Sequence, residues 1–134
     1  MMKLRVVSSR NEIDVLDKNE RMIHLAFRPS NVDFLNLIQS CPRLRVVQLP
    51  RSYHKTLSHA MQVFLDMQGI RVLQGDVWGH RKDLDAYFTV NDRTVNEIRT
   101  MAKGGLPIEE MADQLKERIR LGYDLIEYIV RVAS

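Results

Sequence analysis

Residues 44–75, LRVVQLPRSYHKTLSHAMQVFLDMQGIRVLQG, contain the pattern that decides the fold. Two short apolar runs, residues 44–49 and 70–75, enclose a longer segment, residues 53–68, whose apolar side chains recur at helical spacing. Gly69 follows that segment, in a position where glycine commonly ends a helix. The stretch therefore predicts one strand–helix–strand unit. The side chains expected on the core-facing side of its helix are Leu57, Ala60, Met61, Phe64 and Leu65.

The same alternation continues on both sides of this unit. Two further apolar runs, residues 3–8 and 22–27, precede it. Helical patterns are expected over residues 10–19, 30–41 and 80–90. Alternating strands and helices predict parallel strands joined by right-handed crossovers. We therefore predict an α/β fold, a small doubly wound (flavodoxin- or Rossmann-like) domain with a four-stranded parallel sheet in the order 2-1-3-4.

Residues 91–134 have a helical pattern only, and we expect a C-terminal helical extension packed on residues 1–90 within one compact domain. The sequence Thr94-Val-Asn-Glu97 predicts a capping box at the start of a first helix. Pro107 suits the first position of a second helix, expected to end at about residue 132. The end of that helix is apolar on two faces. A helix with two apolar faces needs two partners. We therefore predict either a homodimer formed through this helix or a groove of the same domain in which the helix lies.

The composition bounds the functional classes. The 134 residues are 45% hydrophobic with a formal net charge of +3, and residues 1–90 hold 13 Lys and Arg against 9 Asp and Glu. This mild basic excess favours anionic ligands but is too weak for a dedicated nucleic-acid binder. The lone Cys41 excludes an internal disulfide and a cysteine-cluster metal site. No apolar run is long enough to span a membrane, so we expect no membrane partner and a cytoplasmic location.

The loops after the four predicted strands each contain an arginine, and the first three also contain a serine. In a parallel α/β sheet such loops meet at one edge, beside helix N-termini. A cation near a helix N-terminus costs about 0.3–1 kcal/mol, and a bound anion would relieve that cost. We therefore predict an anionic small molecule, bearing phosphate or carboxylate, as the ligand. The candidate ligand-binding residues are Ser9, Arg10, Arg28, Ser30, Arg51, Ser52, Lys55 and Arg81.

A structural interpretation of the same loops stays open. Serine before a helix commonly acts as an N-cap, and Ser9 begins a capping-box sequence that ends at Glu12. Ser30 and Asp33 form a looser version of that sequence. The arginines could then pair with carboxylates such as Asp33 or Asp83, with no ligand between them.

An enzyme acting on a phosphorylated or carboxylated metabolite is an alternative of a different class, with His54 or His80 as general base. Asp76 and Asp83 could form an acid/base group with His80, with Trp78 as a stacking platform. The loop that contains them equally suits a structural turn, with Trp78 covering the core. His24, inside an apolar run, is interpreted as a core histidine with its hydrogen bonds satisfied. A third alternative is a dimeric interaction module with no ligand.

Several more specific sites are not supported. No glycine-rich dinucleotide or P-loop motif follows any predicted strand, so we expect no cofactor. His54 and His59 are five residues apart, not the four that let two imidazoles share a metal on one helix face, so we expect no metal site. The C-terminal segment resembles the start of a helix-turn-helix. Lys116 stands where its turn needs glycine, and the following segment is apolar and acidic, which argues against nucleic-acid recognition.

Two resemblances rest on specific phrases. Residues 41–78, with a P-x-L-x-V strand and a G-I-x-V strand, resemble the flavodoxin-like substrate-side half of D-2-hydroxyacid dehydrogenases. This resemblance implies a fold and no activity, because the cofactor domain and its glycine motif are absent. QLPRSYHKTLSHAM (residues 48–61) and GDVWGHRKDLD (residues 75–85) are similar to a family of small uncharacterised proteins from methanogenic archaea. That similarity implies an archaeal, cytoplasmic protein.

Overall fold

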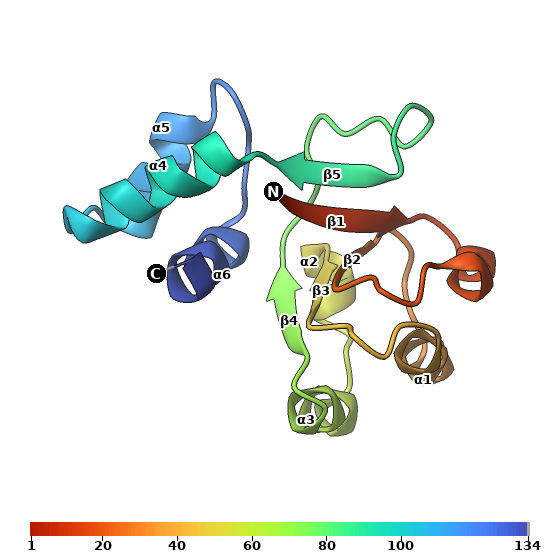
Figure 1. The fold of residues 1–134 in the computed structure, drawn as a ribbon. Coiled ribbons are helices and arrows are strands. Elements are labelled where there is room, and N and C mark those ends of the chain that lie inside the picture. Colours follow the sequence, from red (N-terminus) through yellow and green to blue (C-terminus); the bar gives the residue numbers. More distant parts are fainter. Residues whose placement is uncertain (134) are drawn as a thin grey trace.

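The computed structural model describes residues 1–133, which form one sheet of five strands in the order β4-β3-β2-β1-β5 (Figure 1). Four parallel strands match the predicted apolar runs: β1 (Met2–Val7), β2 (Met22–Leu25), β3 (Val46–Leu49) and β4 (Arg71–Gln74). A fifth strand, β5 (Tyr87–Val90), pairs antiparallel with β1. The α/β class is confirmed. The four-stranded, wholly parallel sheet and the order 2-1-3-4 are wrong.

The helices between the parallel strands all cover one face of the sheet. The strands β1 to β4 lie side by side in the order of the sequence, so each crossover moves to the next strand in the same direction. Because these crossovers are all right-handed, their helices lie on the same face of the sheet. The connecting elements are η1 (Arg10–Val15), α1 (Asn31–Ser40), α2 (Arg51–His54) and α3 (His59–Met67). Their buried side chains share one apolar cluster with the strands; the helical members are Ile13, Phe34, Leu37, Met61 and Leu65. The sheet is therefore singly wound over these residues, which corrects the doubly wound prediction.

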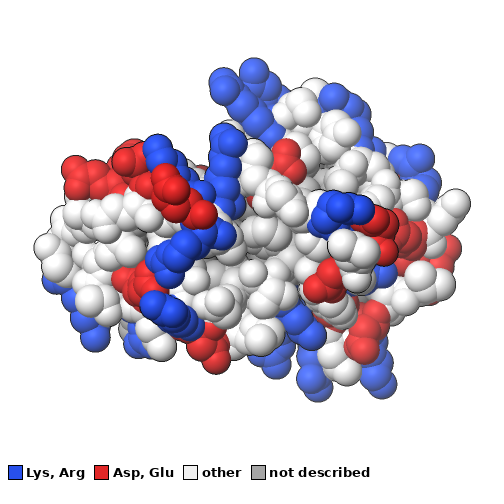
Figure 2. Space-filling view, turned by 90° about the horizontal axis from the view of Figure 1, so that it is seen from above, with Lys and Arg blue, Asp and Glu red and all other residues white. Residues whose placement is uncertain are grey.

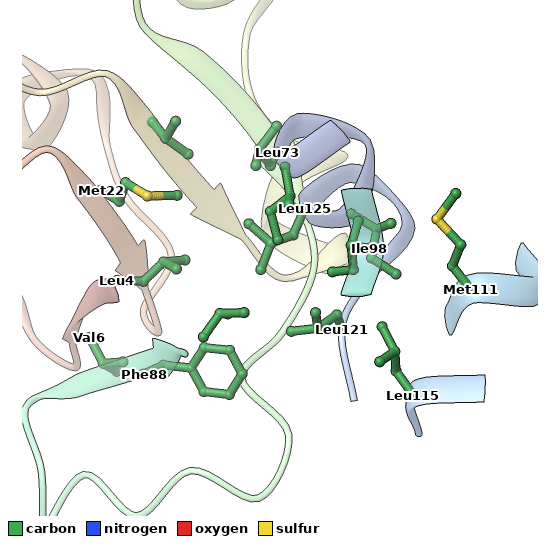
Figure 3. Close-up of a cluster of buried hydrophobic side chains, with 14 residues drawn as sticks. Leu4, Val6, Met22, Leu73, Phe88, Ile98, Met111, Leu115, Leu121 and Leu125 are labelled. Atoms are coloured by element: carbon green, nitrogen blue, oxygen red, sulfur yellow. The ribbon is translucent and has the colours of Figure 1, made fainter. Parts of the chain in front are cut away.

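The C-terminal helices cover the opposite face. They are α4 (Asp92–Lys103), α5 (Ile108–Leu115) and α6 (Tyr123–Ala133). Figure 3 shows Leu4, Met22 and Leu73 of the strands facing Ile98 of α4 and Leu125 of α6. Adjacent strand residues alternate between the two clusters, so that Val6 faces these helices and Val7 faces the crossover helices. The helical extension thus supplies half of the packing that the sheet requires.

Residues 80–90 do not form the predicted helix. Residues 75–86 form a loop that leads from β4 at one edge of the sheet to β5 at the other edge. The sequence Tyr-Phe-Thr-Val of β5 is aromatic and β-branched, which favours a strand. Phe88 and Val90 alternate with less buried neighbours, and Phe88 lies opposite Leu4 of β1. The buried side chains of β5 alternate with a period of two, as expected for a strand. This pattern spans only four residues, which is too short to be recognised within a segment of helical spacing.

Two other predicted helices are divided. The segment 53–68 becomes α2 and α3, because the Ser58 hydroxyl accepts the Met61 N–H and starts a new helix. The helix predicted from Pro107 to about residue 132 becomes α5 and α6, separated by residues 116–122. At the end of this connection Gly122 lies so close to β4 that a Cβ there would be 3.5 Å from the Gln74 carbonyl oxygen.

The predicted start of α4 is displaced by one turn. Asn91 is its N-cap and accepts the Thr94 N–H, so Thr94 lies inside the helix instead of capping it. The sequence Lys103-Gly-Gly105 predicts the end of this helix, and that prediction is correct, since α4 ends at Lys103 and Gly105 adopts a φ of +81°.

The apolar residues of α6 find their partners within the same chain. Leu125, Ile126 and Ile129 are all buried, and α6 contacts α4, α5 and β4. This is the arrangement expected for a helix held in a groove of its own domain, whereas the homodimer stays a prediction. None of the helices within residues 1–133 has the length and apolar content needed to cross a membrane.

Truncation of a buried residue of α6 tests this packing. We expect Leu125→Ala to lower the free energy of unfolding by about 3 kcal/mol, since it leaves a cavity between α6 and the sheet. Val132→Ala on the same helix is the matched control, because Val132 is 54% exposed. Urea unfolding measures both. Equal losses for the two variants would contradict the packing of α6 on the sheet.

Candidate functional site

The serines before the first two helices have the capping role that the structural interpretation assigned to them. Ser9 precedes η1, where the Glu12 carboxylate accepts the backbone N–H groups of Ser8 and Ser9. Ser30 precedes α1, and its hydroxyl accepts the Asp33 N–H at 3.2 Å. Ser52 lies within the short α2 instead and is exposed.

Two of the four candidate arginines are bound to carboxylates. Arg10 donates to both Asp33 oxygens, at 3.2 and 3.1 Å. Burial opposes ionisation of Asp33, but the hydrogen bonds from Arg10 and Ser30 outweigh it and hold the pKa of Asp33 below its ordinary value. Arg81 donates to both oxygens of Asp83 at 3.0 and 2.7 Å, which lowers the pKa of Asp83. Both arginines are therefore already neutralised locally.

A third arginine is held by uncharged groups. Arg28 donates to the Thr56 hydroxyl, and its guanidinium carbon lies 5.0 Å from the centre of the Tyr53 ring. Lys55, at the end of α2, is exposed. Arg10, Arg28 and Arg81 thus each make a separate contact within the chain, instead of meeting at one binding site.

Arg51 differs from the other three. It is exposed, and it forms no ion pair or side-chain hydrogen bond within the described chain. It borders a pocket of about 310 Å³ at the end of β4, which we name the Arg51 pocket. The residues that line it are Arg51, Gln74, Gly75, Asp76, Trp78, Gly122, Tyr123 and Asp124. The pocket therefore combines one arginine, two carboxylates and two aromatic rings.

Beside the Arg51 pocket lies a buried polar pair on the face covered by α4–α6. His24 of β2 and Gln48 of β3 are in register, and both are fully buried. The Gln48 amide nitrogen donates to His24 Nδ1 at 2.9 Å and lies 3.4 Å from the Asp76 carbonyl oxygen. Gln48 Oε1 and His24 Nε2 have no hydrogen-bond partner. A side chain at residue 75 would not fit above this pair, because a Cβ on Gly75 would lie 2.8 Å from Gln48 Oε1.

The buried histidine is neutral. Burial lowers the pKa of His24 to about 4, the Asp76 carboxylate opposes this shift, and His80 adds to it. With Nδ1 accepting from Gln48, the ring proton of neutral His24 is on Nε2, which faces Asp76 Oδ1 at 3.8 Å. The interpretation of His24 as a satisfied core residue is therefore correct for one ring nitrogen and wrong for the other.

Neither of the two histidines proposed as general bases lines the Arg51 pocket. His54 lines a separate groove along β4, together with Asp66, Arg71 and Glu127. His80 Nε2 is buried without a hydrogen bond, and its ring contacts the edge of Phe88. Within the described chain no carboxylate is hydrogen-bonded to either ring, and no group of three His, Cys, Asp or Glu has the spacing of a metal site. The proposed group of Asp76, His80 and Asp83 is divided, since Asp83 pairs with Arg81.

Charges of both signs are mixed on one face of the molecule. Figure 2 shows basic and acidic side chains interspersed over this face, with uncharged surface between them. Several charged residues of the C-terminal segment are paired, because Arg118 binds Glu97 and Lys116 lies 2.8 Å from Asp113. The absence of a nucleic-acid partner stays a prediction.

Residues 3–86 match the model of a family described as a family of unknown function (DUF1699), N-terminal domain. This chain belongs to the DUF1699 family. The match includes β1–β4 and ends just before β5, so the Arg51 pocket takes Gly122, Tyr123 and Asp124 from outside the matched DUF1699 residues. Comparisons with curated proteins and with solved structures find no match. The resemblance to D-2-hydroxyacid dehydrogenases and the origin in methanogenic archaea therefore stay predictions.

Three of the residues that line the Arg51 pocket were predicted: Arg51 as a ligand-binding residue, Asp76 in the acid/base group, and Trp78 as a stacking platform beside that group. Tyr123 and Asp124 were not predicted, and neither was a site role for the pair of His24 and Gln48. One signal was available for that pair, because each is a polar residue at the same place in an otherwise apolar run, MIHL and VVQL.

The neutral state of buried His24 predicts a pH dependence of stability. Unfolded His24 binds a proton below about pH 6.5, whereas folded His24 does so only below about pH 4. The unfolded state therefore gains protons first as the pH falls, and the free energy of unfolding should fall between these values by up to about 1.4 kcal/mol per pH unit.

Urea unfolding at pH 7 and pH 5 checks this expectation. His24→Gln removes the titrating group, so this variant should lose less stability between the two pH values than the wild type. His59→Gln, at an exposed residue of α3, should lose as much as the wild type. If His24→Gln loses as much as His59→Gln, the predicted contribution of His24 is wrong.

Proposed function

We propose that this protein binds a small molecule with a phosphate or carboxylate group in the Arg51 pocket. The observation that supports this proposal is the state of Arg51. It is the one of the four predicted arginines with neither a carboxylate nor another hydrogen-bond partner among residues 1–133, and it borders a concave site. A free guanidinium beside a pocket can bind an oxyanion through two parallel hydrogen bonds.

The start of α6 supports the same ligand class. This helix has 11 residues, and its first turn, Tyr123 and Asp124, lines the Arg51 pocket. The N-terminus of such a helix has a partial positive charge and backbone N–H groups that attract an anion. Arg51 and α6 therefore attract the same kind of group from two sides of one cavity.

The buried pair supports a ligand site as a separate observation. An unpaired polar atom in a protein interior costs about 1–3 kcal/mol, and Gln48 Oε1 and His24 Nε2 are two such atoms next to pocket-lining Gly75 and Asp76. Buried polar atoms of this kind are commonly satisfied by an ordered water or a bound polar group. A polar ligand in the Arg51 pocket, with its bound waters, would offer partners close to both atoms.

The proposal is for binding without catalysis. A general base must reach the reacting atom and usually has an orienting partner. His54 lines the separate groove beside β4, and His80 has no carboxylate partner among the described residues. A cytoplasmic, archaeal setting, implied by the similarity of residues 48–61 and 75–85, belongs to the same proposal.

Thermal unfolding in the presence of anions tests the proposed function. The compounds are phosphate, pyrophosphate, sulfate and small mono- and dicarboxylates, compared with chloride at equal ionic strength. A compound present at about 100 times its Kd should add about 2.7 kcal/mol to the free energy of unfolding. Arg51→Ala should abolish the effect, because it removes the charge partner.

Arg43→Ala is the matched control, since Arg43 is equally exposed but lies outside the Arg51 pocket. It should leave the stabilisation by anions unchanged. The proposal fails if no compound stabilises the protein, or if Arg43→Ala removes the effect as completely as Arg51→Ala.

A further inference from the structure

We infer that the ligand of the Arg51 pocket is dipolar, with a cationic amine as well as its carboxylate or phosphate, in the size class of a free amino acid. This inference rests on the proposed function and adds the second charged group. It follows from the charges, the aromatic rings and the volume of the cavity.

The charged side chains of the Arg51 pocket do not suit a simple anion. One cation, Arg51, faces the same cavity as two carboxylates, Asp76 and Asp124. An anion bound to Arg51 would lie near two negative charges, and like charges repel in proportion to the inverse of their distance. A ligand that also has an ammonium group would turn this repulsion into attraction.

Both carboxylates are held in place but keep acceptor capacity. Asp124 Oδ2 accepts the Gln74 N–H at 2.8 Å, and Asp76 Oδ1 accepts the Val77 N–H at 2.9 Å. In each case the hydrogen bond occupies one oxygen. His24, whose Nε2 lies 3.8 Å from Asp76 Oδ1, is neutral and does not cancel the charge of that carboxylate. An ammonium group has three N–H donors and could bind the remaining oxygens.

An aromatic residue of the pocket suits the same group. One face of the Trp78 ring is already occupied by Arg120, whose guanidinium carbon lies 4.5 Å from the ring centre. Tyr123, 48% exposed, is the second aromatic side chain that lines the Arg51 pocket. Indole and phenol rings attract ammonium groups through their electron-rich faces. The walls of the pocket therefore favour a cationic group beside the two carboxylates.

The volume limits the ligand. At about 310 Å³, the Arg51 pocket is at the lower end of the range of about 300–1,000 Å³ for small-molecule sites. This space suits an amino acid or a phosphorylated amino alcohol, and it is too small for a whole nucleotide together with its bound water.

Calorimetric titration with matched fragments tests the inference. L-alanine is compared with propionate, which lacks the amine, and with ethylamine, which lacks the carboxylate. O-phosphoethanolamine is compared in the same way with phosphate and with ethanolamine, and the other common amino acids complete the panel. At least one dipolar compound should bind ten or more times as tightly as either of its fragments.

Charge-removing variants assign the two ends of the ligand. Asp76→Asn and Asp124→Asn should weaken the binding of the dipolar compound. Each variant should strengthen the binding of the anionic fragment, because a repelling charge is removed. Asparagine at residue 124 can still accept the Gln74 N–H, so the fold should be retained, and the unfolding temperature without ligand checks this. Arg51→Gln should weaken the binding of both the dipolar compound and its anionic fragment. Asp113→Asn, at an exposed residue of α5, is the control that should change neither.

The outcomes separate this inference from the proposed function. If anionic fragments bind as tightly as the dipolar compounds, and Arg51→Gln weakens the binding of both, the pocket is an anion site. The inference of a dipolar ligand is then wrong, while the proposed function stands. If no member of the panel binds at concentrations up to about 10 mM, which corresponds to a free energy weaker than about 3 kcal/mol, both proposals are wrong.

Discussion

The need to cover both faces of a sheet determines the architecture of this protein. Three consecutive crossovers place η1, α1 and α3 on one face, so the strands β1–β4 alone would leave a second apolar face in water. The chain meets this requirement by returning to the far edge as β5 and then covering the open face with α4, α5 and α6. The Arg51 pocket is a result of this return, because the start of α6 comes to rest beside the end of β4.

Local patterns were sufficient to predict the parallel strands, while long-range pairing was not predictable from them. The four apolar runs, separated by helical spacing and capping serines, identified β1–β4 closely. Strand order depends on which edges meet in space, and the sequence VVQL of β3 would pair equally well with another apolar strand. The strand Tyr87–Val90 was missed because its stability comes from β1, more than 80 residues earlier in the chain.

The candidate site was predictable to the same limited extent. The position of Arg51 after an apolar strand placed it at the carboxyl edge, as the loop argument expected. The partners of Arg10 and Arg81 were also visible, since Asp33 and Asp83 were named as alternatives. Tyr123 and Asp124 were hidden, because they were assigned to the middle of one long helix. The break at residues 116–122 separates two helices that pack on different neighbours, and no local pattern in the sequence indicates it.

The walls of the Arg51 pocket come from two parts of the chain. The matched domain supplies Arg51 and the loop after β4, while the opposite wall comes from the segment that follows it. Tyr123 and Asp124 border the cavity, whereas Leu125 and Ile126, the next two residues of the same helix, are buried against the sheet. A substitution that reshapes this wall of the cavity must therefore leave the packing of α6 intact, because one turn of helix belongs to both the pocket and the core.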